Sequence, residues 1–212
     1  METMSKQRMG KFVTFEGGDG AGKTTQIALL RKALERTGQR VCVTREPGGD
    51  ALAEGIRNLL LHTTMTARAE LLLFLASRAQ NVEQVILPSL KAGEVVLCDR
   101  FIDSSVAYQG YARGLGREPV ALLNTFATDG LVPDLTVLLD LAPEVGLARQ
   151  TDTNRMEAES LAFHRQVRAG FLAEAEKAPE RFCVLDASLP VTTLHTTILT
   201  RLQLMLTARE DS

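Results

Sequence analysis

The stretch FVTFEGGDGAGKTTQ, residues Phe12–Gln26, decides the fold. It begins with apolar residues typical of a buried strand, continues through a glycine-rich turn and ends at the start of an expected helix. Its centre matches G-x-x-x-x-G-K-[ST], and the flanking strand and helix are the context that this motif requires. The sequence therefore predicts a loop that binds the phosphates of a nucleotide. Its residues are Gly17, Gly18, Asp19, Gly20, Ala21, Gly22, Lys23 and Thr24.

Each part of this loop has a chemical role. The glycines let backbone N–H groups surround phosphate oxygens, and the helix that follows adds the positive end of its dipole. Lys23 is expected to reach the β- and γ-phosphates, and Thr24 offers its hydroxyl to Mg²⁺. The loop alone does not distinguish a motor, a switch and a transferase.

Three absent features narrow that choice. The sequence contains no N-K-x-D motif, which argues against a guanine-specific switch. Asp99 ends an expected strand and is followed by Arg100, whereas a hydrolytic motor usually has a glutamate there to orient water. No coiled coil or DNA-binding element is present for hydrolysis to drive. These absences favour transfer of the phosphoryl group.

The rest of the chain alternates short apolar strands with helices. Such a pattern argues for a parallel sheet covered on both faces. The fold class is therefore α/β, a doubly wound five-stranded parallel sheet flanked by helices. We expect one domain over residues 11–212, preceded by a disordered extension over residues 1–10. The expected strands lie at residues 11–17, 41–47, 94–100, 134–141 and 182–187.

Composition excludes several classes of protein. The 212 residues carry a net charge of −2, which does not favour binding to nucleic acid or to an anionic membrane. No apolar run is long enough to span a bilayer, and the polar N-terminus lacks the apolar core of a signal peptide. We therefore expect a cytoplasmic protein. Cys42, Cys98 and Cys183 fit no zinc spacing, and we interpret them as small buried residues in a reducing compartment.

Arginines lie at the carboxyl ends of two of the expected strands, directly after their apolar runs. Arg45 comes after VCVT and Arg100 after VVLCD, and Arg57 lies on the next helix after Arg45. Ligands of open α/β sheets bind at the carboxyl ends of the strands, so these guanidinium groups are expected to face the phosphate loop. Guanidinium groups suit bidentate binding of phosphate. The pattern indicates a second, phosphate-bearing substrate that accepts the phosphoryl group.

Two further groups of residues predict an acceptor pocket. Phe74 and Arg78 are four residues apart on an expected helix and share a face, so a ring that stacks would lie beside a guanidinium that donates. Ser105, Tyr108 and Gln109 lie within about one helical turn of one another. Core packing remains the alternative for Phe74.

The segment at residues 67–90 is apolar on more than one face. One interpretation is a central helix buried within the monomer. The other is a helix that also packs against a second subunit. The sequence alone leaves both open.

A polar segment at about residues 149–157 predicts a short mobile lid. Arg149 and Arg155 flank QTDTN in this segment, which follows the fourth expected strand. Kinases must exclude water from the transferred group, and lid arginines can stabilise the charge that develops on it. A plain surface loop is the alternative.

The sequence resembles the bacterial thymidylate kinases, a family of nucleoside monophosphate kinases. The matching motifs run in order over nearly the whole chain after Lys11, and TREPGG together with DR-x-x-x-S-x-x-A-Y-Q-G is highly specific. The resemblance implies transfer of a phosphoryl group from ATP to dTMP for dTTP synthesis, with Mg²⁺ as cofactor and a homodimer as assembly. The motifs are FEGGDGAGKTTQ, TREPGG, LLLFLASRAQ, CDRFIDSSVAYQGYARGLG, PDLTVLLDLAPEVGL, NRMEAES and VLDASLP.

The resemblance also implies roles on the acceptor side. Arg45 and Arg100 would hold the 5′-phosphate of dTMP, with Arg57 close by, and Asp19 would contact the 3′-hydroxyl. Phe74 would stack on thymine.

For the remaining acceptor residues, the resemblance implies contacts to the base and the sugar. Arg78 would hydrogen-bond the base edge, Ser105 and Gln109 would face the base, and Tyr108 would crowd the 2′ position. Asp99 would act in the Mg²⁺ shell. The backbone at residues 187–189 would border adenine.

The lid departs from the family pattern, because it is shorter and has fewer arginines than in many relatives. Some relatives carry the catalytic arginine inside the phosphate loop, where this chain has Gly20. We therefore expect Arg155 to be the main transition-state arginine, with Arg149 supporting it or lying against adenine. On this hypothesis, Arg155→Ala lowers kcat by orders of magnitude and barely changes dTMP affinity.

Two rival functions make different demands on the sequence. A kinase for a free hydroxyl acceptor, such as a deoxynucleoside, would need a base carboxylate and no phosphate-binding arginines, so Arg45 and Arg100 argue against it. A non-catalytic regulator would bind ATP tightly without acceptor-dependent turnover.

Overall fold

A parallel five-stranded sheet forms the centre of the computed structural model, which describes residues 10–149 and 154–207. The strands are β1 (Lys11–Glu16), β2 (Val41–Arg45), β3 (Val95–Asp99), β4 (Leu135–Asp140) and β5 (Phe182–Asp186). Their order in the sheet is β2-β3-β1-β4-β5. All four pairings are parallel. The predicted fold class is confirmed. Residues 1–9 of the expected N-terminal extension and residues 150–153 of the predicted lid lie outside the described residues.

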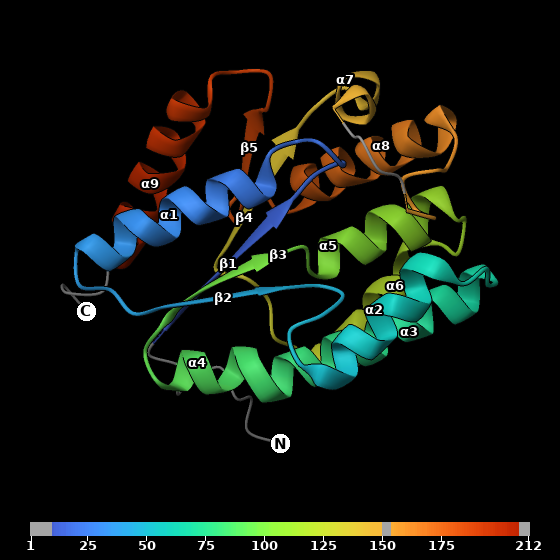
Figure 1. The fold of residues 1–212 in the computed structure, drawn as a ribbon, viewed down its shortest axis with the longest axis horizontal. Coiled ribbons are helices and arrows are strands. Elements are labelled where there is room, and N and C mark those ends of the chain that lie inside the picture. The colour runs from blue at the N-terminus through green and yellow to red at the C-terminus, as the bar shows by residue number, and fades with distance from the viewer. Residues whose placement is uncertain (1–9, 150–153, 208–212) are drawn as a thin grey trace.

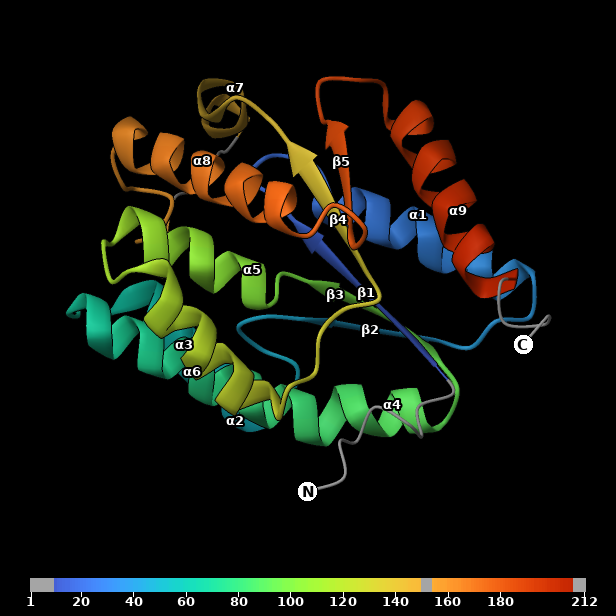
Figure 2. The same ribbon diagram turned by 180° about the vertical axis from the view of Figure 1, so that it is seen from behind.

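The phosphate-loop strand β1 lies in the middle of the sheet and packs on both faces. Val13 and Phe15 join the cluster that contains side chains of α1 (Lys23–Arg36) and α9 (Val191–Thr207). Phe12, on the opposite face, packs with Ile86 and Leu90. Figures 1 and 2 show α1 and α9 on one face of the sheet and the other long helices on the opposite face. Successive side chains of β1 point to opposite faces of the sheet, so this one strand contributes to the hydrophobic core on both faces.

Several helices lie beyond the carboxyl ends of β2 and β3 (Figure 1). They include α2 (Ala51–His62), α3 (Ala67–Asn81) and α6 (Arg117–Thr128). The expected helix at 67–90 continues from α3 through a π-helical turn, η2 (Val82–Ile86), into α4 (Leu87–Lys91). One side of α3 is buried, but Leu72 on its other side is 59% exposed.

After β3, the chain forms α5 (Ile102–Ser105) and a π-helical segment, η3 (Val106–Ala112). From the sequence, residues 103–113 are expected to be helical. π-helical turns are rare and occur frequently at functional sites. This one carries Tyr108 and Gln109.

The remaining helices follow β4. They are α7 (Pro143–Ala148) and α8 (Leu161–Lys177), which precede β5. No helix within the described residues is long and apolar enough to cross a membrane. The three cysteines are free thiols, as expected; Cys98 is buried, and Cys42 and Cys183 are partly buried.

Candidate active site

The phosphate loop connects β1 to α1 and needs glycine at several positions. Gly17, Gly20 and Gly22 have φ angles of 132°, 72° and 93°, which side chains other than glycine rarely adopt. A Cβ on Gly20 would lie 2.3 Å from the carbonyl oxygen of Gly146 on α7. No side chain fits at position 20 without moving that backbone, so this loop position has no room for an arginine.

Lys23 is folded over its own loop. Its Nζ donates hydrogen bonds to the carbonyl oxygens of Gly17 (3.1 Å) and Gly18 (2.9 Å), and the side chain is buried. Burial lowers the pKa of Lys23, and the Arg100 guanidinium lowers it further. An ammonium group desolvated in this way is poised to bind an anion that enters the loop.

Thr24 and Asp99 provide oxygens that suit a divalent cation. The Thr24 hydroxyl donates a hydrogen bond to Asp99 Oδ2 over 3.3 Å. Asp99 Oδ1 is buried and has no hydrogen-bond partner. A buried carboxylate oxygen without a partner is costly unless a cation or water satisfies it. Oxygen ligands beside a phosphate site are what Mg²⁺ prefers, so these residues fit the ion.

Arg100 joins the phosphate loop to the acceptor side. It has a positive φ of 69°, and its guanidinium donates to the Gly17 carbonyl oxygen (3.1 Å) and to Asp19 Oδ1 (2.5 Å). The group lies 5.2 Å from the centroid of the Tyr108 ring, whose hydroxyl donates to Asp19 Oδ2 (3.4 Å). Burial opposes ionisation of Asp19, but the Arg100 and Lys23 charges outweigh it and lower its pKa. Arg100, Asp19 and Tyr108 therefore form one charged cluster.

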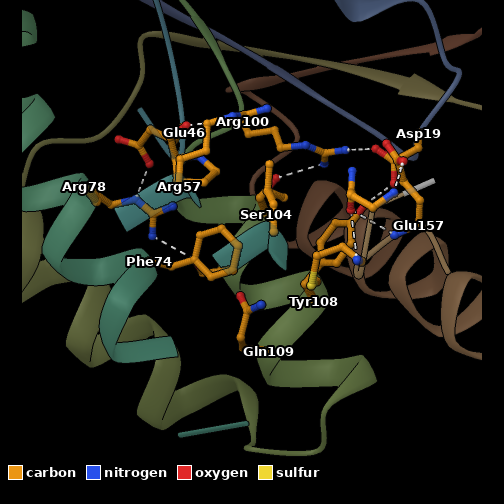
Figure 3. A pocket seen from close by; sticks show the side chains of 15 residues that line it. Asp19, Glu46, Arg57, Phe74, Arg78, Arg100, Ser104, Tyr108, Gln109 and Glu157 are labelled. Atoms are coloured by element: carbon orange, nitrogen blue, oxygen red, sulfur yellow. Dashed lines mark hydrogen bonds and ion pairs between the residues drawn. The ribbon is translucent and has the colours of Figure 1, made fainter. Parts of the chain in front are cut away.

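A pocket of about 630 Å³ of space between protein atoms, part of it open to solvent, lies next to this cluster (Figure 3). Most of the predicted acceptor residues line it: Asp19, Arg57, Phe74, Arg78, Arg100, Ser105, Tyr108 and Gln109. Residues that the sequence analysis did not single out also line it: Glu46, Pro47, Leu61, Ser104, Asn154, Met156 and Glu157.

Arg45 and Arg57 differ in their positions. Arg57 lines the pocket and donates to the Pro47 carbonyl oxygen over 2.9 Å. Arg45 pairs with Glu54 at 2.8 Å, is about half exposed, and is not among the lining residues. The structure thus brings Arg57 and Arg100 together at the pocket and leaves Arg45 at its margin.

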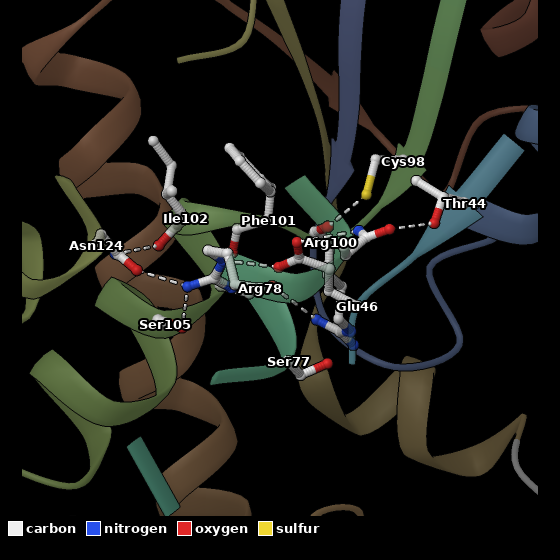
Figure 4. A network of polar contacts seen from close by, with 12 residues as sticks. Thr44, Glu46, Ser77, Arg78, Cys98, Arg100, Phe101, Ile102, Ser105 and Asn124 are labelled. Atoms are coloured by element: carbon white, nitrogen blue, oxygen red, sulfur yellow. Dashed lines mark hydrogen bonds and ion pairs between the residues drawn. The ribbon is translucent and has the colours of Figure 1, made fainter. Parts of the chain in front are cut away.

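Arg78 is held in a buried polar network (Figure 4). Its side chain is 1% exposed, and its Nε donates to Glu46 Oε2 over 2.7 Å. The two Nη groups donate to Ser105 Oγ (2.8 Å), Asn124 Oδ1 (2.5 Å) and the Phe101 carbonyl oxygen (2.9 Å). These contacts use four of the five N–H donors of a guanidinium and leave one for a ligand. The network fixes Arg78 rigidly at the pocket wall.

Comparison with known proteins agrees with this geometry. The family model described as Thymidylate kinase matches residues 15–198. A thymidylate kinase from Geobacillus sp. (strain WCH70) is 50% identical over 190 residues, which cover 86% of this chain and 90% of the relative. A thymidylate kinase from Synechococcus sp. (strain JA-3-3Ab) is 55% identical over 177 residues, 83% of this chain and 87% of the relative.

The chain belongs to the thymidylate kinase family. Members of this family phosphorylate dTMP to dTDP with ATP. A solved structure of thymidylate kinase from Ehrlichia chaffeensis matches the fold with a TM-score of 0.76 and 38% sequence identity. The match covers 92% of this chain and 98% of the Ehrlichia chaffeensis chain.

The two arginines assigned to the thymidylate kinase lid lie in different places. Arg149 follows α7, and its Nη1 donates to the Gly20 carbonyl oxygen over 2.9 Å, at the phosphate loop. Arg155 lies on the acceptor side, where its Nη1 pairs with Glu70 (2.7 Å) and its Nε donates to the Leu60 carbonyl oxygen (3.0 Å). In this structure Arg149, and not Arg155, contacts the phosphate loop.

Glu16, the last residue of β1, also supports this site and was not predicted from the sequence. Its carboxylate accepts hydrogen bonds from the Phe101 N–H (2.8 Å), the Ser104 N–H (3.3 Å) and the Ser104 hydroxyl (2.6 Å). Burial, with the nearby charge of Asp103, raises the pKa of Glu16 to about 8. The signal in the sequence was a carboxylate directly after the strand-like run FVTF. Glu16 caps α5 and so supports the turn that presents Arg100.

Proposed function

We propose that this chain transfers the γ-phosphoryl group of Mg·ATP to the 5′-phosphate of dTMP. The observation that carries the proposal is the position of Arg100, whose guanidinium contacts the phosphate loop and also lines the acceptor pocket. Two phosphate-bearing substrates bound there would meet at this residue. Membership of the thymidylate kinase family supports the same reaction.

The residues at the phosphate loop hold the donor and neutralise charge. Lys23 binds the β- and γ-phosphates, and Arg149 approaches the transferred group from α7. Thr24 and Asp99 would hold Mg²⁺, which supplies positive charge to the phosphate oxygens. The acceptor phosphate is already an anion at neutral pH, so no strong base is needed. Catalysis then consists of positioning and electrostatic stabilisation. Residues 187–189, after β5, would border adenine.

The acceptor pocket positions dTMP in line with the donor. Arg100, with Arg57 beside it and Arg45 at the margin, holds the 5′-phosphate. Phe74 stacks on the base and Arg78 donates to its edge. Ser105 and Gln109 face the thymine base. Asp19 and Tyr108 contact the sugar.

Glu46 bears on the rival reaction, phosphorylation of a free hydroxyl. That reaction needs a carboxylate able to take a proton. Glu46 is a buried carboxylate of the pocket wall, and its burial raises its pKa, but it accepts hydrogen bonds from Arg78 (2.7 Å) and Asn81 (3.2 Å). Because these contacts occupy both oxygens, Glu46 is suited to stabilise the pocket wall and is poorly placed to act as a base.

The experiment that tests this function is ADP release from Mg·ATP with one acceptor at a time. We expect strong turnover with dTMP and little with dCMP, dGMP, AMP, thymidine or no acceptor, and loss of turnover when EDTA removes the metal. Preference for another monophosphate would keep the kinase and overturn the thymine pocket. Tight ATP binding without turnover under any acceptor would indicate a regulator.

We also propose a homodimer, formed through the outer face of α2, α3 and α6. Apolar side chains lie exposed on these helices: Leu52, Leu59, Leu72, Leu122 and Phe126. The three helices lie side by side (Figures 1 and 2). An apolar face of this kind is typical of a subunit interface.

Sedimentation equilibrium tests the assembly. We expect a dimer for the wild type and a monomer for Phe126→Asp, because Phe126 is 88% exposed and a buried aspartate would be unpaired. Leu204→Asp, on α9 at the other face of the sheet, is the matched control and stays dimeric. A monomeric wild type would contradict the proposal. The cytoplasmic location stays a prediction.

A further inference from the structure

Glu70 is a buried carboxylate just outside the acceptor pocket. It lies in the first turn of α3, and its side chain is 1% exposed. It is not among the residues that line the pocket. Three side chains from two other segments converge on it: Gln109, Arg113 and Arg155. Burial opposes ionisation of Glu70, but these three hydrogen-bond donors outweigh it and lower its pKa.

The first consequence concerns the Gln109 amide. Gln109 Nε2 donates to Glu70 Oε1 over 2.9 Å. An ionised carboxylate can only accept hydrogen bonds, so Glu70 selects the NH₂ end of the amide and leaves the carbonyl oxygen for other partners. Gln109 lines the pocket, and Figure 3 shows its amide on the side of Phe74 and Tyr108. Glu70 therefore presents a fixed acceptor oxygen to a base that carries a ring N–H.

The second consequence concerns residues 154–157, the second half of the predicted lid. Arg155 Nη1 pairs with Glu70 Oε2 at 2.7 Å, and the Arg155 backbone N–H donates to the Leu61 carbonyl oxygen at 3.3 Å. The neighbours Asn154, Met156 and Glu157 line the pocket. Pinning Arg155 to α3 and to the end of α2 thus holds one wall of the pocket in place.

Arg113 joins the two halves of this arrangement. It follows η3 and donates to both oxygens of Glu70 (3.2 Å each). It also pairs with Glu159 at 2.6 Å and contacts Met156 Sδ at 3.8 Å. Arg113 therefore links the buried Glu70 carboxylate both to the end of η3 and to the segment at 154–159.

We propose that Glu70 is a positioning residue of the acceptor pocket, which orients the Gln109 amide and anchors the pocket wall at 154–157 through Arg155. This inference rests on the proposed function. Glu70 touches neither the phosphate loop nor any reacting atom. Its loss should therefore weaken acceptor binding in the ground state and the transition state alike, which raises KM and leaves kcat unchanged.

Glu70→Gln is the test variant, because it keeps the shape and removes the charge. We expect KM for dTMP to rise roughly tenfold, with kcat within about twofold and KM for ATP unchanged. Glu174→Gln is the matched control. Glu174 is another buried carboxylate held by cations, Arg117 at 2.8 Å and Lys177 at 3.3 Å, but it does not line the pocket. Glu174→Gln should lower the melting temperature about as much as Glu70→Gln does, but it should leave KM for dTMP unchanged.

A double-mutant cycle shows whether Glu70 acts through Gln109. If it does, Glu70→Gln adds less to KM in a Gln109→Leu background than in the wild type. The same cycle with Arg155→Met in place of Gln109→Leu measures how much of the effect of Glu70 on KM passes through Arg155. Full additivity in both cycles, or a KM for Glu70→Gln equal to that of Glu174→Gln, would overturn the inference.

The proposed function and the role of Glu70 can be contradicted separately. If the wild type prefers an acceptor other than dTMP, the proposed function fails, and the same comparison of KM is made with the preferred acceptor. The role of Glu70 is then decided by the ratio of KM for that acceptor between Glu70→Gln and Glu174→Gln.

Discussion

Lys23→Met should lower kcat by a factor of about 10³, because removal of one preorganised charge from a buried phosphate site typically costs that much. The Lys23 ammonium is desolvated over the loop carbonyls of Gly17 and Gly18, and an entering phosphate would replace those contacts. The effect is measured as initial rates at saturating ATP and dTMP. Affinity for dTMP, measured by calorimetry, should change little, since Lys23 does not line the acceptor pocket.

Lys32→Met is the control for this substitution. Lys32 lies on the exposed side of the same helix, α1, so its loss removes a charge without touching the loop. It should behave as the wild type. A Lys23→Met enzyme that keeps a normal kcat would contradict the assignment of the loop as the donor site.

Arg149→Ala should also lower kcat by about 10³ and leave KM for dTMP nearly unchanged. Arginines that stabilise the transferred phosphoryl group are worth at least that factor. Arg149 reaches the Gly20 carbonyl oxygen, whereas Arg155 is occupied by Glu70 and the Leu60 carbonyl oxygen. The sequence interpretation gave the main role to Arg155; the structure favours Arg149.

Arg155→Ala provides the comparison. From its anchor position we expect an increase in KM for dTMP and a small change in kcat, which is the reverse of the hypothesis drawn from the sequence. Steady-state kinetics of the two variants separates the possibilities. A collapse of kcat in Arg155→Ala with normal kcat in Arg149→Ala would restore the original assignment.

The fold class and the phosphate loop follow from the sequence alone. Both rest on local information: apolar runs of strand length, and a loop whose glycines must adopt positive φ, as Gly17, Gly20 and Gly22 do. Most of the predicted acceptor residues also line one pocket, and Arg100, Ser105, Tyr108 and Gln109 among them lie in one motif after one strand. Such contacts are close in sequence, so spacing predicts them.

The tertiary structure alone decided which charges meet. Arg45 and Arg100 have the same sequence context, yet one pairs with Glu54 at the margin and the other joins the phosphate loop to the pocket. The contacts of Arg155 with Glu70, and of Glu16 with Ser104, bridge residues 85 and 88 positions apart in the chain. Partners so distant are chosen by how the helices pack on the sheet, and no local pattern encodes that choice.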